Sequence, residues 1–358
     1  SVIGETRLHG PFTLGKAYGE KAISEKINWT LIQNENDTKD NARQGSLVPG
    51  LTVTKNTKTI TSALNFQVSK TGIYRVTYEM LKAAGYDLKG IQTAKIGLTS
   101  GGKAVPIYTY GKSTFGPGSY IEFFGQALDT LYTDTNIYTL QTNATKPPRI
   151  KVNTSKPTSR TKYATSYLET LTINNQNQYT QGAPGTDPWY DTSLLAYKTL
   201  KYWNLPFTLN GLSNTSADSN LKLVVWGGTD WAQTPDHHLL VSVNGMPMAD
   251  QTFDGFTEQT LNLVIPSGVL VEGTNTLQLT LPGDTGVNYE IQWLDQYSIS
   301  YPRVFAAQDG RLTFTSTGAG FKVTNLPVNS VVVYRLDPSG TLNRLTPVLT
   351  KAPNGTYT

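Results

Sequence analysis

The chain has 358 residues, of which 16% are charged, a net charge of +4 and no cysteine. Without cysteine it can form no disulfide, no thiolate metal site and no cysteine nucleophile. The mild positive charge does not indicate nucleic acid or an anionic membrane as partner, and no apolar run approaches the roughly 20 residues of a membrane span. Abundant Gly (32), Pro (19) and Tyr (20) with few charges favour a secreted or cell-surface β-rich protein.

The first half predicts a small β domain. Residues 1–58 have little periodicity, whereas alternating apolar residues predict a strand that ends at Val68 and a second strand over 73–78. Helix formers at 79–84, followed by Gly85, predict one short helix.

The second half predicts a β-sandwich. The polar, Pro-containing stretch 143–162 indicates a domain boundary, and short strands separated by turn signals follow it. Asn244-Gly245 is the strongest of these signals, because both central positions of a two-residue hairpin favour positive φ. Residues 290–294 and 297–301 are predicted as two separate strands. Such a series without a long helix favours a jelly-roll sandwich.

The expected fold class is therefore mainly all-β, in four parts. They are an irregular or extended segment (1–58), a β-rich domain with one short helix (59–150), a jelly-roll, galactose-binding-like β-sandwich (160–305), and a small β extension leading toward a downstream domain (306–358).

The sequence offers no catalytic constellation. His9, His237 and His238 are its histidines, and no G-x-S-x-G elbow accompanies them, so a Ser-His-Asp triad is not indicated. His237 and His238 are adjacent on a predicted strand and therefore point to opposite faces. No catalytic residue and no enzyme activity are predicted for this chain.

One loop suggests a calcium site. Asp129, Asp134 and Asn136 supply hard oxygen donors within a few residues, which suits Ca²⁺ as a bound cofactor. EF-hand spacing is absent. The alternative is that each side chain bonds its own backbone in Asx turns.

Aromatic residues suggest a ligand surface. Trp189, Tyr190 and Trp231 lie near turns, and such rings stack on sugars or peptides. The alternative is that they pack in the core of the sandwich. A surface glycan or a surface protein is thus one hypothesis for a partner, with the chain as an autonomous adhesin-like binding module.

Three phrases, in order, resemble a known family. They are residues 72–81 (GIYRVTYEML), residues 121–125 (IEFFG) running to 132–140 (YTDTNIYTL), and residues 294–303 (LDQYSISYPR). Together they resemble the region before the catalytic domain in gingipain-like cysteine peptidases (peptidase family C25) and the related type IX secretion sortase. The phrases at 243–245 and 270–275 also resemble galactose-binding-like jelly rolls.

The resemblance implies a role without catalysis. The family's His/Cys dyad lies on a downstream caspase-like domain, and no cysteine exists here to take that part. The chain is expected to be the N-terminal part of a longer secreted bacterial precursor and to fold, dock or restrain the downstream peptidase domain. If that peptidase cleaves after Arg or Lys, Arg149, Lys156 and Arg160 are candidates for a restraining or maturation site; a plain linker is the alternative.

Overall fold

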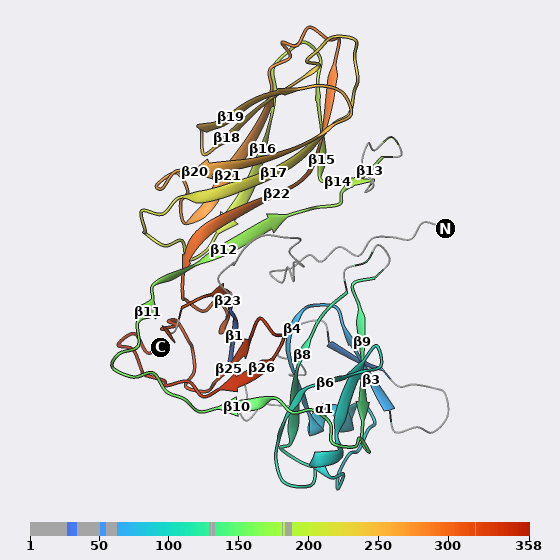
Figure 1. Cartoon of the computed structure of the whole chain (residues 1–358), viewed down its shortest axis with the longest axis vertical. Coiled ribbons are helices and arrows are strands. Elements are labelled where there is room, and N and C mark those ends of the chain that lie inside the picture. Colours follow the sequence, from blue (N-terminus) through green and yellow to red (C-terminus); the bar gives the residue numbers. More distant parts are fainter. Residues whose placement is uncertain are drawn as a thin grey trace. The chain divides into compact units, whose positions relative to one another are not determined.

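The computed structural model describes residues 27–33, 51–54, 63–128, 130, 133–180, 182, 188–318 and 320–358 (Figure 1). Contacts divide the chain into two compact units, one formed by Ser1–Tyr163 with Ala307–Thr358 and the other by Ala164–Ala306. Nearly all described elements are β-strands, which confirms the all-β fold class. The expected segment 1–58 lies largely outside the described residues.

The first unit contains two small sheets around a shared core. One sheet has the order β2 (Leu51–Thr54), β3 (Ala63–Val68), β9 (Asn136–Gln141), β5 (Gly97–Ser100) and β6 (Lys103–Val105). The other has the order β4 (Gly72–Thr77), β8 (Tyr120–Gly125) and β7 (Ile107–Tyr110). Phe66, Tyr74 and Tyr138, drawn from both sheets, pack their rings on Phe123.

The predicted helix is present as α1 (Tyr78–Ala83). Thr77 caps it, since its hydroxyl accepts the amide of Met80 at 3.2 Å. Gly85 lies just beyond the helix with φ of +89°, a conformation that glycine adopts without strain. A short 3-10 turn, η1 (Thr93–Lys95), follows.

A third sheet of the first unit joins both ends of the chain. Its order is β10 (Lys151–Asn153), β26 (Leu342–Leu345), β25 (Val331–Leu336), β1 (Ile27–Gln33) and β23 (Arg311–Ser316). The strands of the expected 306–358 extension thus pair with β1 and β10 rather than with one another alone. β10 also lies inside the stretch 143–162 that the sequence predicted as a boundary. Two further short strands, outside this sheet, are β11 (Tyr163–Ala164) and β24 (Gly320–Phe321).

The second unit is a two-sheet sandwich. One sheet has the order β12 (Ser166–Ile173), β22 (Glu290–Val304), β17 (Ser219–Gly227) and β20 (Glu258–Ile265), with β15 (Thr192–Ala196) also paired to β22. The other has the order β16 (Lys201–Leu209), β21 (Gly273–Leu281), β18 (His237–Val243) and β19 (Met246–Phe253). A short ribbon joins β13 (Gln178–Tyr179) to β14 (Trp189–Tyr190).

This strand order identifies the sandwich as a jelly roll. Numbered from β15 to β22, one sheet reads first, eighth, third, sixth and the other reads second, seventh, fourth, fifth, which is the arrangement of two interleaved Greek keys. Alternate residues of the strands face inward and form one core, for example Leu223, Leu239, Leu279 and Ile299. Figure 1 shows β22 beside both β12 and β17.

Two local expectations have different outcomes. The Asn244-Gly245 hairpin is confirmed: β18 and β19 pair across it, and both residues have positive φ, +49° and +81°. The expected pair of strands at 290–294 and 297–301 is wrong, because β22 is one continuous strand. Against β17, the register shifts so that Val224 faces Gln296 and Val225 faces Leu294. Asp295 is the extra residue of this β-bulge. Its charge within an apolar run suggested a boundary between two strands, although the strand continues through it.

Candidate functional site

A buried ionic cluster lies in the first unit, centred on Glu122 of β8. The Glu122 carboxylate is 0% exposed and accepts hydrogen bonds from Arg75 of β4, where Nε lies 2.8 Å from Oε1. On its other oxygen it accepts the hydroxyl of Tyr334 and Nε of Arg344, the latter at 3.2 Å. Strands β4 and β8 of the three-stranded sheet and strands β25 and β26 of the third sheet therefore meet at one carboxylate.

Aromatic rings contact both arginines of the cluster. The guanidinium carbons of Arg75 and Arg344 lie 4.2 Å from the ring centre of Tyr120 and 4.3 Å from that of Tyr108, respectively. Burial, reinforced by the Glu122 charge, raises the pKa of Tyr120 to about 12 and that of Tyr334 well above its usual value. Both phenols are therefore neutral at physiological pH. The Arg344 side chain is 17% exposed whereas Glu122 is fully buried, and the cluster serves to hold the third sheet of the unit to the strands β4 and β8.

The expected calcium residues have the following places. Asp129 lies outside the described residues. Asp134 accepts the hydroxyl of Thr135 at 2.8 Å. The side-chain oxygen of Asn136 accepts two hydrogen bonds, from the amide of Ile137 at 2.8 Å and from the hydroxyl of Ser100 at 3.2 Å. A calcium ion at this loop would compete with those bonds.

Two of the expected ligand aromatics lie on β14. Tyr190 is 1% exposed and its ring packs on Trp293, with 5.5 Å between ring centres. Trp189 is half-buried and lies edge-on to Tyr179, which is 56% exposed. Among the described residues of this ribbon, the Trp189–Tyr179 pair presents an aromatic surface.

Trp231 belongs to a second aromatic group, at the end of the sandwich where β16 begins and β21 ends. Its ring packs edge-on against Tyr289, with 5.1 Å between centres and 84° between planes, and its Nε1 donates to the Tyr289 carbonyl at 2.9 Å. Tyr197 packs on the same Tyr289 at 5.9 Å and is 59% exposed. We call Tyr197, Trp231 and Tyr289 the aromatic group; sequence reasoning found only its tryptophan, because the three lie in three separate loops.

Asp236 holds Trp231 in place. This carboxylate is 0% exposed; one oxygen accepts the amide of Trp231 at 3.0 Å and the other accepts the amide of Gly255 at 2.8 Å. A charged acceptor for two main-chain amides fixes the loop that carries the indole. The acidic residue was visible in the sequence, but nothing in its spacing marked it as a loop anchor.

The two adjacent histidines face opposite ways, as expected from strand geometry. His237 is buried, donates from Nε2 to the carbonyl of Thr229 at 3.1 Å and stacks on Phe253. His238 places its two ring nitrogens 2.8 Å from Asp284 and 2.8 Å from Asp250. Burial lowers the pKa of His238, but hydrogen bonds and charge from both aspartates outweigh that effect and raise it.

Searches for other sites cover the described residues only. Within them, no group of three or more His, Cys, Asp or Glu side chains is arranged to hold a metal ion. In the same part of the chain, no helix has the length and apolar character needed to cross a bilayer.

Comparisons with known proteins show the fold. No family model and no curated protein sequence matches the chain. Among solved structures it is similar to dimeric latent PorU from Porphyromonas gingivalis, with a TM-score of 0.56 and 15% identity over 82% of this chain and 30% of that chain. Weaker matches include a β-porphyranase of glycoside hydrolase family 86 from Bacteroides plebeius (TM-score 0.24, 10% identity, 71% of this chain and 36% of that one). Another is the ANX2 ectodomain from Arabidopsis thaliana (TM-score 0.26, 10% identity, 73% of this chain and 90% of that one). The chain thus has the fold of a part of PorU and spans 30% of its length.

Proposed function

We propose that this chain is a non-catalytic accessory region of a secreted or surface-located C25-like protein, and that it folds, docks or restrains a peptidase domain of the same precursor. The observation that carries the proposal is the fold shared with PorU, a C25-like protein of type IX secretion, over 82% of the chain. The three ordered sequence phrases point to the same family. Since the sequence contains no cysteine, the peptidase nucleophile has to come from elsewhere.

The site geometry supports a scaffold rather than an active centre. Arg75 and Glu122 belong to two of the family-like phrases. Both side chains lie in the buried cluster that joins the early and late strands of the first unit. Arg149, one of the candidate basic residues for a restraining site, uses its guanidinium on the carbonyls of Thr93 and Ile96, at 3.1 Å and 2.9 Å. Lys156 and Arg160 are exposed and remain the candidates for that role.

The test begins with the coding sequence beyond Thr358, which should contain a C25-like peptidase domain. That domain is then produced alone and with this chain, and its yield of active enzyme, its binding to the chain and its hydrolysis of Arg and Lys substrates are measured. A folding role should raise the yield of active enzyme, and a docking role should give binding without inhibition. A restraining role should give inhibition by the folded chain and none by the heat-denatured chain. A downstream domain unrelated to peptidases, or none of the three effects at micromolar chain, would contradict the proposal.

A second candidate function is glycan or surface binding through the aromatic group. The observation in its favour is that Tyr197 exposes 59% of its surface next to Trp231 and Tyr289, which gives a ring platform at one end of the sandwich. A glycan array and pull-down on insoluble polysaccharides test it. Binding should disappear in Trp231→Ala while circular dichroism is unchanged; Trp189→Ala tests the Trp189–Tyr179 pair in the same way.

A further inference from the structure

Three polar atoms are buried without a hydrogen-bond partner in the sandwich, on residues at the starts of β18 and β22. They are Nδ1 of His237, Oε1 of Glu290 and Oε1 of Gln292, and no hydrogen bond reaches them from the described part of the chain. The three side chains are at most 1% exposed, so bulk water does not hydrate these atoms either. Since buried polar atoms normally have a partner, this cluster indicates a bound ligand.

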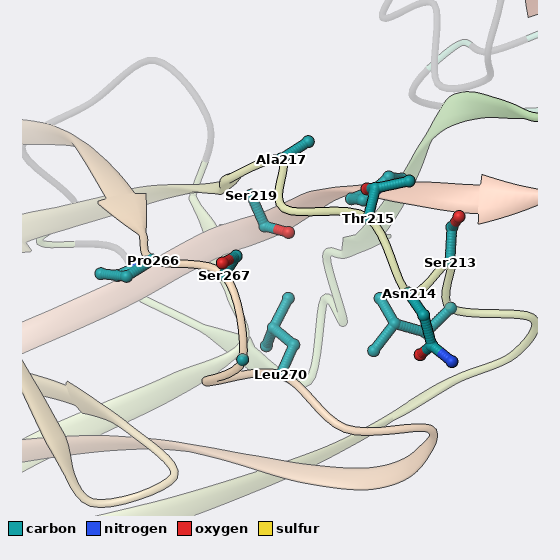
Figure 2. A pocket seen from close by; sticks show the side chains of 11 residues that line it. Ser213, Asn214, Thr215, Ala217, Ser219, Pro266, Ser267 and Leu270 are labelled. Carbon is teal, nitrogen blue, oxygen red and sulfur yellow. The ribbon is translucent and has the colours of Figure 1, made fainter.

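A hollow between the β16–β17 and β20–β21 connections gives no comparable signal (Figure 2). Figure 2 shows the side chains of Asn214, Thr215 and Ser267 around it, and all three residues are exposed. Water can hydrate these polar groups, so their lack of protein partners does not point to a ligand.

The three buried atoms are all acceptors. Nε2 of His237 donates to the Thr229 carbonyl at 3.1 Å, so the neutral ring carries no proton on Nδ1. Nδ1 lies 3.7 Å from Oε2 of Glu290, which is too far for a hydrogen bond even if Nδ1 were protonated. The free oxygens of Glu290 and Gln292 are acceptors as well. A cation can bind all three atoms, whereas one water molecule cannot donate to all of them.

The charge of the cluster also favours a cation. Asp236 and Glu290 are buried carboxylates, and among the described residues each has an ion-pair contact with His237 alone. The Asp236 carboxylate also accepts two main-chain amides. Glu290 accepts from neutral donors, the amide of His238 at 3.1 Å and Nε2 of Gln292 at 3.2 Å. Because a buried carboxylate without a counter-charge is costly, a bound cation would stabilise Glu290.

The surrounding contacts hold these side chains as metal ligands are held. A metal-bound histidine usually donates its other ring nitrogen to a carbonyl, as His237 does, and a ligating carboxylate is itself hydrogen-bonded, as Glu290 is. The ring of His237 stacks on Phe253 with 4.7 Å between centres. With metal–ligand distances of about 2.0–2.2 Å, an ion that touches both the ring nitrogen and the carboxylate fits within their separation of 3.7 Å.

We infer that His237, Glu290 and Gln292 bind one divalent transition-metal ion. The imidazole favours Zn²⁺ or a similar ion over Ca²⁺ and Mg²⁺, which take oxygen ligands. The set combines one imidazole, one carboxylate and one carboxamide, so it differs from the groups of three or more His, Cys, Asp or Glu side chains that the described residues lack.

The ion joins the two sheets of the sandwich. His237 lies on β18 in one sheet, and Glu290 and Gln292 lie on β22 in the other. The neighbours of two ligands in the chain, Asp236 and Tyr289, hold or form the aromatic group, so the ion also fixes the base of that group. The inference concerns the second unit alone and does not depend on the proposed accessory function.

The experiment measures the metal bound to the whole chain, produced without a tag in medium with added ZnCl₂. Zinc per chain is determined by inductively coupled plasma mass spectrometry after a brief EDTA wash, first of the folded chain and then in urea. Because the ligands are at most 1% exposed, the ion should survive the wash of the folded chain and be released on unfolding. X-ray absorption at the zinc edge should show an imidazole among nitrogen and oxygen ligands.

Variants assign the site. Glu290→Gln keeps the shape of the side chain but removes its charge, and His237→Gln removes the imidazole. His238→Gln is the matched control, because that adjacent ring lies between Asp250 and Asp284 instead. After refolding with ZnCl₂, the wild type and His238→Gln should bind one ion, and the affinity should fall at least about tenfold in Glu290→Gln and in His237→Gln. Circular dichroism establishes that each variant is folded.

Three results would overturn the inference. One is a wild-type chain that keeps no zinc through the EDTA wash. Another is zinc that is lost in His238→Gln but kept in Glu290→Gln, which would assign the ion to the surface contact of His238 with Asp250 and Asp284. The third is an absorption spectrum without imidazole, and this measurement on the wild type decides the question even if His237→Gln does not fold.

Discussion

Tyr334 donates a buried hydrogen bond to Glu122, a residue 212 positions earlier in the chain. The same carboxylate binds Arg75 from β4 and Arg344 from β26. Each donor hydrogen-bonds to a lone pair of the carboxylate that would otherwise be buried without a partner. Together the donors balance a negative charge that is fully shielded from water. The C-terminal strands of the first unit are therefore held to its early strands by a polar contact in addition to the apolar contacts among Ile73, Val332 and Leu342.

Neutralising Glu122 should strongly destabilise the first unit. In Glu122→Gln, Arg75 stays buried without its counter-charge, and breaking a buried pair in this way costs about 3–5 kcal/mol of unfolding free energy. Urea denaturation followed by fluorescence measures the loss. Glu258→Gln, an exposed position in the second unit, is the control and should change little. Equal stability of the two variants would show that the charge of Glu122 makes no net contribution to the free energy of unfolding.

Removing only the phenol oxygen should have a smaller effect. Tyr334→Phe keeps both arginines on Glu122 but deletes one hydrogen bond to a carboxylate, which is worth about 1.5–3 kcal/mol. The same denaturation experiment checks it. The ordering is the informative part: a loss in Tyr334→Phe as large as that in Glu122→Gln would mean that the hydrogen bond from the phenol, rather than charge balance, dominates.

The stability of the second unit should depend on His238 near neutral pH. The pKa of His238 is raised in the folded state, since Asp284 and Asp250 outweigh the effect of burial. The stabilisation is therefore complete below the unfolded value of about 6.5 and is lost as the pH rises through the higher folded value. Both aspartates are exposed, so the effect should be at most about 1 kcal/mol. Denaturation midpoints from pH 5 to pH 9 should decline for the wild type, and His238→Gln should flatten that decline; parallel curves would exclude His238.

Replacing Asp236 by asparagine should loosen the loop of Trp231. The amide side chain retains one acceptor, so either Trp231 or Gly255 loses its bond, at a cost of about 1–3 kcal/mol. Denaturation gives the stability, and acrylamide quenching of tryptophan fluorescence should increase if the loop opens. Asp230→Asn, an exposed neighbour, is the matched control. Unchanged quenching and stability would remove Asp236 from the support of the aromatic group.

The calcium hypothesis for Asp129, Asp134 and Asn136 predicts a thermal shift. Weak extracellular sites have dissociation constants on the order of 10⁻⁴–10⁻³ M, so a few millimolar CaCl₂ should add about 1–2 kcal/mol by mass action. The melting temperature is compared with CaCl₂ and with EDTA. Asp134→Ala should abolish the rise, whereas Glu258→Ala should not. A wild-type melting temperature that calcium leaves unchanged would reject the site and favour the Asx-turn alternative.

Local signals predicted much of the fold but little of the site. Gly85 marked the end of α1 and Asn244-Gly245 marked the hairpin, because each of these features depends on the φ of one or two residues. The Glu122 cluster depends instead on partners 47, 212 and 222 residues away, and strand register decides whether they meet. Arg75 and Glu122 are single charges within otherwise apolar strands, a signal that could have pointed to a buried pair. Their pairing follows from the antiparallel register of β4 and β8, in which the two residues lie opposite one another.

The sandwich is an insertion within the first unit. The chain leaves that unit at Tyr163, returns to it at Ala307, and pairs Ser166 with Val304 between these points. Because the first and last strands of the sandwich lie side by side, its ends are close enough for a short peptide to replace the whole insert. A gene with this pattern can gain, lose or exchange the sandwich as one segment, so that the two units can diverge at different evolutionary rates.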